Sequence, residues 1–212
     1  MPADTEPPEI TIYSDYVCPF CYLGRASLSA YQAERDERLA IDWQPFDLRA
    51  GKRGPDGEID DSVDDGKDDE YFEQARKNVE RLRERYDADA MLDFDDVPEV
   101  DSLEAQIASL AVQREHPDSW LAFDEALFEA LWVDGRDIGD ADVIAAVADT
   151  VGLDGEEVRG ALDDEALREE VFDDFDEARH RGISGVPTFV YDETGARGAV
   201  PPEHLERLVE ER

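Results

Sequence analysis

The stretch SDYVCPFCYLGRASL, residues 14–28, holds the only two cysteines of the 212-residue chain, Cys18 and Cys21. In this stretch, a strand-like pattern of residues is followed by a helical pattern. The preceding EITIY (9–13) alternates and is rich in residues that favour strands, which predicts a β-strand. From Pro19 to about Arg38, apolar residues recur at helical spacing. The two cysteines are therefore predicted to lie where a strand is followed by a helix.

A second strand and a block of helices are predicted next. LAIDWQPFDL (39–48) alternates with Leu39, Ile41 and Trp43 inward, and the two strands of such a β-α-β unit should be parallel. Residues 50–70 are rich in Gly and Asp and predict a loop and a domain boundary. Five apolar stripes at helical spacing then predict helices with their stripes in the core. They are Phe72, Ala75, Val79, Leu82, Tyr86; Leu103, Ile107, Leu110, Ala111; Trp120, Phe123, Leu127, Leu131; Val143, Ile144, Val147, Val151; and Leu167, Val171, Phe175, Ala178, closed by Gly182.

After Gly185 the pattern becomes that of strands again. VPTFVYDETGARGAV (186–200) predicts strand, turn and strand, with DETG as the turn, and PPEHLERLVEER (201–212) predicts a last helix with proline near its start. The order β-α-β, helices, β-β-α predicts an α/β fold interrupted by an α-helical insertion. We place the α/β part at residues 9–62 and 164–212 and the insertion at 63–163.

The composition is that of a folded and strongly acidic protein. Hydrophobic residues make up 41% of the chain, and 57 acids against 21 bases give a formal net charge of −36. The apolar periodicity indicates a core rather than disorder. The composition resembles cytoplasmic proteins of extreme halophiles, in which concentrated salt screens an acidic surface. An anionic surface repels phosphate, so we expect no nucleic-acid partner.

Neither a signal peptide nor a membrane span is predicted. MPADTEPPEITIYS (1–14) has no basic or apolar leader segment, and no apolar run approaches the ~18 residues of a span. We therefore expect a cytoplasmic protein with no membrane partner. In that compartment, two close cysteines are more often catalytic or metal-binding than structural.

The spacing of the two cysteines separates their roles. If Pro19 is the first helical residue, Cys18 is the N-cap and its sulfur should accept bonds from the free amides of the first turn. These amides and the helix dipole favour the thiolate form of Cys18. Cys21 lies one turn further on, within reach of Cys18 and facing the core. We expect Cys18 to attack a disulfide and Cys21 to resolve the mixed disulfide.

The pair of cysteines has three other interpretations. A zinc site needs two further ligands, and the three histidines, His116, His180 and His204, are scattered along the chain. A structural disulfide across so short a loop adds little stability, because the entropic gain grows with loop length. The two thiols could also be unrelated. Redox chemistry is the interpretation that the spacing favours.

SDYVCPFCYLG (14–24), followed much later by RGISGVPTFV (181–190), resembles the DsbA-like thioredoxin-fold oxidoreductases, in particular their FrnE-like branch. EALWVDGRDIGDADVIAAVADTVGLD (129–154) is similar to that branch's helical insertion. The resemblance covers about Ile10 to Leu208 and implies a thioredoxin-like fold. It also implies a cis peptide bond between Val186 and Pro187. Such a proline beside Cys18 blocks metal binding there and leaves the Val186 backbone free to pair with a substrate peptide.

The sequence departs from the family in two places. The residues between the cysteines are Pro19-Phe20 rather than the Pro-His of strongly oxidising members, and Asp15 is near, so the disulfide should be less oxidising. Where the FrnE-like branch has a pattern close to Asn-Thr-x-x-Ala-His, this chain has DSLEAQ (101–106). Asp101 and Gln106 thus stand at the Asn and His places, and a substrate contact of that histidine cannot be carried over.

We therefore predict a thiol–disulfide oxidoreductase that acts on protein or small-molecule disulfides through its CPFC dithiol, without a metal, nucleotide or flavin cofactor. Its partners would be a disulfide or dithiol substrate and a redox protein or low-molecular-weight thiol that exchanges electrons with it. Phe20, Val186 and Pro187 are the predicted substrate-binding residues. Tyr16 and Trp43 are further candidates for apolar surface near the site, although Trp43 could equally pack in the core.

Two alternatives from other classes stay open. Kappa-class glutathione transferases and 2-hydroxychromene-2-carboxylate isomerases resemble the chain in the insertion, but they need one activated hydroxyl or thiol and no resolving Cys21. A non-catalytic binding protein or chaperone would use the helical face and would keep its activity after loss of both cysteines.

Overall fold

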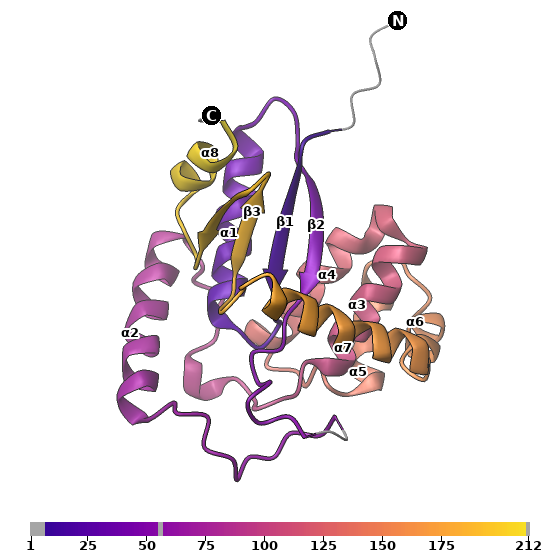
Figure 1. Ribbon diagram of the computed structural model, residues 1–212. Coiled ribbons are helices and arrows are strands. Elements are labelled where there is room, and N and C mark those ends of the chain that lie inside the picture. Colours follow the sequence, from indigo (N-terminus) through magenta and orange to yellow (C-terminus); the bar gives the residue numbers. More distant parts are fainter. Residues whose placement is uncertain (1–6, 55–56, 211–212) are drawn as a thin grey trace, which may run out of the picture.

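One four-stranded sheet organises the protein. The computed structural model describes residues 7–54 and 57–210. Its strand order is β2-β1-β3-β4 (Figure 1). As predicted, β1 (Glu9–Ser14) and β2 (Ala40–Pro45) are parallel; β3 (Thr188–Tyr191) pairs antiparallel with β1 and with β4 (Thr194–Arg197). The predicted hairpin is confirmed, but Tyr191 pairs with Thr194, so the turn holds only two residues and the last two of DETG belong to β4.

The predicted helices are present, and two short elements are additional. Within residues 7–54 and 57–210, the α-helices are α1 (Pro19–Glu34), α2 (Asp69–Arg85), α3 (Leu103–Glu115), α4 (Pro117–Trp132), α5 (Ala141–Thr150), α6 (Gly155–Ala161), α7 (Glu165–His180) and α8 (Pro202–Glu210). The sequence did not predict α6 or the 3₁₀ turn Phe94–Asp96, because 7 and 3 residues are too short to show a period. The last two residues of the helix predicted at 201–212 lie outside the described part of the chain.

Helix α1 ends earlier than predicted, at Glu34 instead of near Arg38. The side-chain amide of Gln32 explains the difference. Its Nε2 donates to the carbonyl of Leu39 (3.1 Å), and its Oε1 accepts from the Leu39 amide (2.9 Å). Because these two hydrogen bonds fix Leu39 next to Gln32, the chain leaves the helix and continues into β2.

Helices cover both faces of the sheet, so the core has two parts. A smaller apolar cluster joins Ile10 and Ile12 of β1 to α1 and α8, and a larger one extends through the insertion helices. Figure 1 shows α1 and α8 together on one side, and α3, α4, α5 and α6 gathered near the carboxyl ends of β1 and β2. Leu39 and Trp43 are buried as predicted, whereas Ile41 is only half-buried.

Helix α2 stands beside α1, apart from the other insertion helices (Figure 1). Of its apolar stripe only Val79 is buried, and Phe72 is 38% exposed. The prediction that Phe72 belongs to the core is therefore wrong: the stripe has the period of a helix, but the first turn of α2 extends beyond the surface that Val79 packs against. The division into an α/β part and an insertion stays a prediction.

Aspartates cap four of the helices. The carboxylates of Asp68, Asp140, Asp154 and Asp164 accept backbone N–H bonds at the starts of α2, α5, α6 and α7. Such bonds satisfy amides that have no partner within the helix. At its other end, α7 is followed by Gly182 with φ of +80°, a conformation that favours glycine.

In its described part before Asp69, the loop predicted at 50–70 contains no helix or strand. Ion pairs nevertheless hold part of it in place. The guanidinium of Arg53, 5% exposed, binds Asp47 (2.7 Å) and both carboxylate oxygens of Asp101 (2.7 and 2.8 Å). Asp56, part of the acid-dense stretch, lies outside the described residues. Among those residues, no helix has both the length and the apolar character needed to cross a membrane.

Candidate active site

The junction of β1 and α1 places Cys18 at the helix start. Cys18 is the N-cap, with extended backbone angles, and Pro19 is the first helical residue, as predicted. The prediction that its sulfur accepts amide bonds is wrong, because no side-chain cap bond is made. The Cys18 thiol instead lies 3.5 Å from the carbonyl oxygen of Val186 and can donate to it. A segment 168 residues away thus supplies the group that faces the thiol.

Cys21 lies one turn further along α1. Its amide donates to the Cys18 carbonyl (3.0 Å), and the two thiols are not joined by a disulfide. Both are buried, Cys18 at 3% and Cys21 at 1% exposure. Burial raises the pKa of the Cys21 thiol well above its usual value, and the Cys18 side chain beside it adds to the rise. Among the described residues, no group of three or more His, Cys, Asp or Glu could hold a metal ion.

The segment before β3 completes the junction. The Val186–Pro187 peptide bond is cis. Pro187 is buried against α1: a Cβ on Gly24 would come within 2.9 Å of its Cγ. Its carbonyl accepts the amide of Gly198 (2.7 Å). The structure therefore brings together Cys18, Cys21, Val186 and Pro187, which the sequence places at opposite ends of the chain.

A groove of about 1250 Å³ opens over this junction. Cys18, Phe20 and Val186 line it, whereas Cys21 and Pro187 do not. Further apolar walls come from the segment after β2, from α2, from the chain between α2 and α3, and from the end of α4. They include Phe46, Leu48, Tyr71, Phe72, Ala75, Phe94, Val97, Pro98, Val100, Leu131 and Trp132. Of the two thiols, only that of Cys18 is therefore placed to meet a molecule in the groove.

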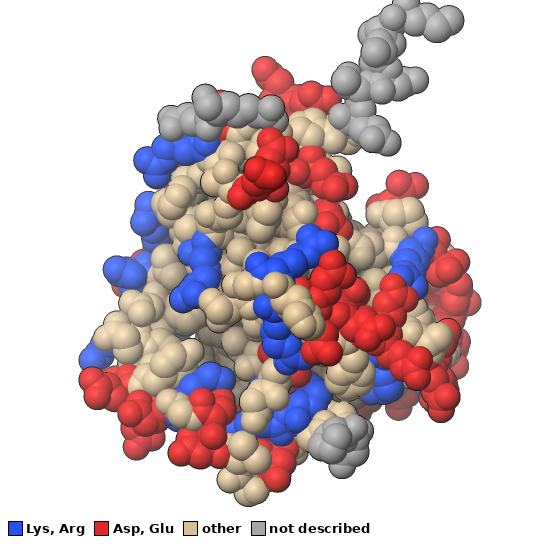
Figure 2. Space-filling view, in the orientation of Figure 1, with Lys and Arg blue, Asp and Glu red and all other residues tan. Residues whose placement is uncertain are grey.

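Charged side chains also line this groove, and most of its cations are neutralised. Lys52, Lys67 and Arg76 pair with Asp61 (3.5 Å), Asp65 (2.6 Å) and Asp95 (2.7 Å), all groove residues. Arg49 and Arg197 have no carboxylate partner within the described chain. Figure 2 shows basic side chains across the middle of this face, with acids dense on the right, where α6 and α7 lie in Figure 1.

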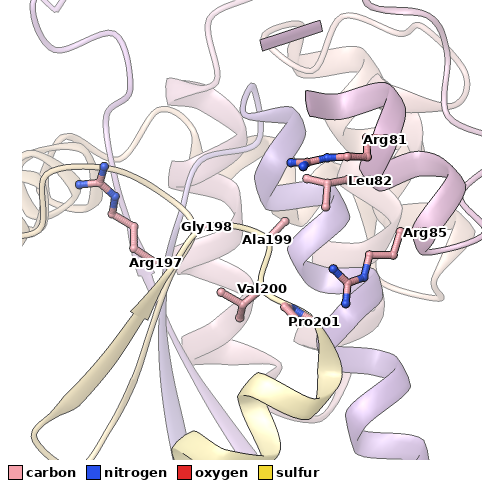
Figure 3. A pocket seen from close by; sticks show the side chains of 8 residues that line it. All are labelled: Arg81, Leu82, Arg85, Arg197, Gly198, Ala199, Val200 and Pro201. Carbon is pink, nitrogen blue, oxygen red and sulfur yellow. The ribbon is translucent and has the colours of Figure 1, made fainter. Parts of the chain in front are cut away.

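A second cavity, of about 460 Å³, adjoins the first. It lies between α2 and the connection from β4 to α8, and it shares Arg197 and Gly198 with the groove. In Figure 3, Arg81 and Arg85 of α2 reach toward this connection, whereas the Arg197 side chain points away. The Tyr86 hydroxyl donates to the carbonyl of Ala199 (2.8 Å). The end of α2 is thus attached to the chain that follows Gly198, whose amide binds the Pro187 carbonyl.

The buried carboxyl group of Asp15 links the β1–α1 junction to neighbouring segments. Asp15 is 1% exposed, and its oxygens accept from the Ser102 hydroxyl (2.5 Å) and the amides of Val17 (3.2 Å) and Leu48 (2.9 Å). Burial raises the pKa of Asp15 to about 6, although these hydrogen bonds act in the opposite direction. Asp15 therefore joins the loop between β1 and α1, the segment after β2 and the residue that precedes α3.

A buried ion pair lies on the insertion side of α1. The Arg25 guanidinium, one turn beyond Cys21, pairs with the carboxylate of Asp124, which is fully buried in α4. The Tyr16 hydroxyl also binds Asp124 (3.0 Å) and Ser109 (2.8 Å). This pair was not predicted from the sequence. Its signal was a charged residue within an otherwise apolar helical face: Arg25 before Leu28, and Asp124 beside Phe123.

Two predicted groove aromatics belong to the core. Tyr16 and Trp43 are each 1% exposed and do not line the groove. Their rings lie 6.0 Å apart, and Trp43 also packs near Trp120 (6.2 Å). The prediction for Tyr16 is wrong because its hydroxyl has buried partners in the insertion; for Trp43 the core alternative is confirmed. Phe20 alone of the three lines the groove.

The positions where the FrnE-like pattern differs have structural partners here. Gln106 is fully buried, where its Oε1 accepts from the Phe46 amide (3.2 Å) and its Nε2 donates to the Phe46 carbonyl (3.3 Å). Asp101 binds Arg53. Neither residue lines the groove. In this chain, the two positions hold the segment after β2 against α3.

Comparisons with known proteins agree with this arrangement. Protein YwbO of Bacillus subtilis (strain 168) is 26% identical over 204 residues, which cover 94% of each chain. The crystal structure of the probable DsbA oxidoreductase SCO1869 from Streptomyces coelicolor matches with a TM-score of 0.75 and 26% identity, over 94% of this chain and 87% of that one.

A 2-hydroxychromene-2-carboxylate isomerase matches with a TM-score of 0.71 and 20% identity, over 93% and 92% of the two chains, which shows likeness of fold. The model of the DSBA-like thioredoxin domain matches residues 9–210, nearly the whole chain. With a thioredoxin-like sheet, helices inserted between β2 and β3, and a CPFC motif at the β1–α1 junction, the protein belongs to the DSBA-like thioredoxin domain family.

Proposed function

We propose that the protein is a dithiol–disulfide oxidoreductase in which Cys18 attacks a substrate disulfide and Cys21 resolves the mixed disulfide. The observation that carries the proposal is the unequal placement of two thiols one helical turn apart. Cys18 lines the groove and begins α1, whereas Cys21 is enclosed behind it. Burial raises the pKa of the Cys21 thiol, which keeps it protonated until it is needed.

The reaction proceeds in two exchange steps. The Cys18 thiolate forms a bond to one sulfur of the substrate disulfide, the S–S bond breaks, and the other substrate sulfur leaves as a thiolate that takes up a proton. Cys21 then loses its proton and attacks the Cys18 sulfur, which releases the second substrate thiol. The substrate gains two electrons and the protein ends as a Cys18–Cys21 disulfide. A low-molecular-weight thiol or a redox protein returns the two electrons; the same steps reversed oxidise a dithiol.

Val186 serves as the docking edge in this proposal, with Pro187 fixing its place. The Val186 carbonyl faces the Cys18 thiol across 3.5 Å. Once Cys18 is ionised it can no longer donate, so this carbonyl becomes free to accept an N–H from an extended substrate chain. Formation of the nucleophile and release of the docking group thus occur together. Phe20, at the groove wall, adds apolar contact.

Trapping of the intermediate tests the assignment. A Cys21→Ser variant retains the attacking thiol and should accumulate a mixed disulfide when mixed with oxidised substrate, detectable as an adduct by mass spectrometry. Cys18→Ser is the matched control and should form none. Alkylation at graded pH should modify Cys18 before Cys21 in the wild-type protein. An adduct on Cys18→Ser alone, or earlier alkylation of Cys21, would overturn the assignment of roles.

A cytoplasmic location and function in concentrated salt are part of the proposal. They rest on the net charge of −36 and its resemblance to halophile proteins. The retained Cys21 favours dithiol exchange over the chemistry of the isomerases, which the shared fold alone does not assign.

A further inference from the structure

The second cavity, between α2 and the connection from β4 to α8, has a basic lining in a strongly acidic protein. Within the described part of the chain, eight residues line it, of which three are arginines and none is Asp or Glu. The whole chain, by contrast, has 57 acids and 21 bases. The lining is Arg81, Leu82, Arg85, Arg197, Gly198, Ala199, Val200 and Pro201. A hollow walled by one sign of charge concentrates ligands of the opposite sign, so this cavity is suited to an anion.

Two of the three arginines face the cavity together. Arg81 and Arg85 are four positions apart on α2, which puts their side chains on the same face of the helix. In Figure 3 both guanidinium groups reach toward the connection, whereas that of Arg197 points away. Among the described residues, neither Arg81 nor Arg85 pairs with a carboxylate. Arg81 donates to Asn78 Oδ1 at 3.4 Å, and the Arg85 guanidinium lies 5.9 Å from the centre of the Tyr86 ring. Both arginines are exposed, so each keeps N–H groups that a ligand can reach.

The other basic residues of α2 show that carboxylates are within reach of this helix. Each has an acidic partner: Arg76 with Asp95 (2.7 Å), Lys77 with Glu73 (2.5 Å) and Arg83 with Asp93 (2.7 Å). None of these six residues lines the second cavity. In the described chain, the two arginines of α2 that lack a carboxylate are therefore the two that line the cavity. This coincidence of position and missing partner points to an anionic ligand rather than to a merely solvated helix face.

The opposite wall is apolar, and it is held in place without the arginines. The Tyr86 hydroxyl donates to the Ala199 carbonyl (2.8 Å), and the Ser27 hydroxyl donates to the Val200 carbonyl (2.6 Å). Leu82, which is half-buried, adds an apolar side chain from α2. The cavity, at about 460 Å³, is within the ~300–1,000 Å³ of small-molecule sites. A ligand that fits both walls has one anionic end and one apolar end.

We propose that this cavity binds a small phosphate monoester that carries an apolar group. Its phosphate lies between Arg81 and Arg85, and its apolar group lies against Leu82 and Val200. A phosphate monoester carries about −1.5 to −2 charges at pH 7, which matches two guanidinium groups better than the single charge of a carboxylate. Guanidinium groups also pair with phosphate oxygens through two parallel hydrogen bonds. The ligand needs no sulfur, so the site goes beyond the proposed dithiol exchange and does not depend on it.

A titration of the full-length protein with phenyl phosphate, followed in two-dimensional amide NMR spectra, tests the site. A pH of about 7.5 keeps the phosphate doubly charged, and about 0.5 M potassium chloride screens non-specific attraction. The amide signals of Leu82, Arg85 and Val200 should shift most, with a Kd of about 1 mM or below. Inorganic phosphate lacks the apolar group and phenylacetate lacks the second charge, so each should bind at least ~fivefold more weakly.

Two double variants of α2 give a matched comparison. Arg81→Gln/Arg85→Gln should raise the Kd for phenyl phosphate at least ~tenfold, because the charge-assisted hydrogen bonds are lost. Lys77→Gln/Arg83→Gln removes the same number of charges from the same helix but changes no lining residue, so its Kd should stay within about twofold of wild type. Circular dichroism and melting check that both variants are folded. If Arg81→Gln/Arg85→Gln misfolds, Arg85→Gln alone should still raise the Kd at least ~threefold.

Four results would overturn the inference. Without saturable shifts up to ~10 mM phenyl phosphate, the arginines would serve only solubility and the carboxyl end of the helix dipole. An equal rise in Kd for the two double variants would show general attraction to α2, and shifts centred on Cys18 and Phe20 would place the anion in the groove instead. Equal or tighter binding of phenylacetate would assign the cavity to a carboxylate. Each result leaves the proposed dithiol chemistry intact, because no probe contains sulfur, and failure of mixed-disulfide trapping would likewise leave this site intact.

Discussion

Removal of the Asp124 carboxylate should be among the most damaging single changes in this protein. Asp124→Ala takes away the partner of a buried guanidinium on the helix that carries both cysteines. Among its partners in the described residues, Arg25 would keep the ring of Trp120, whose centroid lies 5.4 Å from its central carbon, and a cation–π contact contributes ~0.5–2 kcal/mol. Tyr16 would lose its bond to the same carboxylate and keep Ser109.

The size of the effect follows from the burial of both ions. Breaking one side of a buried pair costs about 3–5 kcal/mol, a large share of a total stability of ~5–15 kcal/mol. Removing both charges is different: Arg25→Met/Asp124→Leu replaces the pair with apolar side chains, which is often neutral or stabilising. The double variant should therefore be more stable than the single one, although it loses more hydrogen-bonding groups.

Urea denaturation in 3 M potassium chloride, followed by tryptophan fluorescence, measures this ordering. With a slope of about 2 kcal/mol per molar urea, a 4 kcal/mol loss moves the midpoint by about 2 M. The double variant should recover more than half of that shift. The reasoning that the pair is held in a medium of low polarity would be refuted by either of two results. One is a urea midpoint of Asp124→Ala within ~0.5 M of wild type, and the other is a double variant no more stable than the single one.

Three further predictions concern the junction and the charge. Gly24→Ala should destabilise the protein by about 1–3 kcal/mol, because its Cβ would meet Pro187 at 2.9 Å. Gly160→Ala, whose Cβ would have nothing within 4 Å, should stabilise it by ~0.5–1 kcal/mol. Equal urea midpoints for the two variants would contradict this. Because the pKa of Asp15 is raised to about 6, its contribution to stability is complete below the unfolded value near 3.8 and is lost as pH rises through 6. From pH 4 to 7, the free energy of unfolding of the wild type should therefore fall by ~2 kcal/mol more than that of Asp15→Asn, and parallel pH profiles would show otherwise. The urea midpoint of the wild type should rise between 0.05 M and 3 M potassium chloride, as the screening length falls from roughly 14 Å to below 3 Å around 36 excess charges; a midpoint that does not move would leave the acidity unexplained.

Local signals made the active-site junction predictable. Alternation before Cys18 and proline after it define a strand end and a helix start within a few residues, and the structure has both. The return to a period of two after Gly185 likewise located β3 and β4. These features depend on neighbours in sequence, which is why a single chain reveals them.

What could not be predicted depends on contacts between distant segments. Periodicity assigned Phe72 to an inward stripe, but whether a neighbour covers it is decided by where α2 lies. Arg25 and Asp124 are 99 positions apart, and no spacing rule joins them. The Cys18 sulfur was predicted to accept hydrogen bonds from the amides of its own helix, yet its partner is the Val186 carbonyl. The assignment to the FrnE-like branch also stays a prediction.

The aspartates that begin α2, α5, α6 and α7 bear on how the protein could be re-engineered for dilute buffer. Converting acids to lysine without regard to position would lower the repulsion between like charges, but it would also remove four helix caps, each of which contributes about 1 kcal/mol to stability. Asparagine caps a helix about as well as aspartate. Changing Asp68, Asp140, Asp154 and Asp164 to asparagine would therefore remove four charges at little structural cost, and lysine could be reserved for acids on exposed helix faces. These changes would lower the net negative charge and leave the groove, Cys18 and Cys21 unaltered.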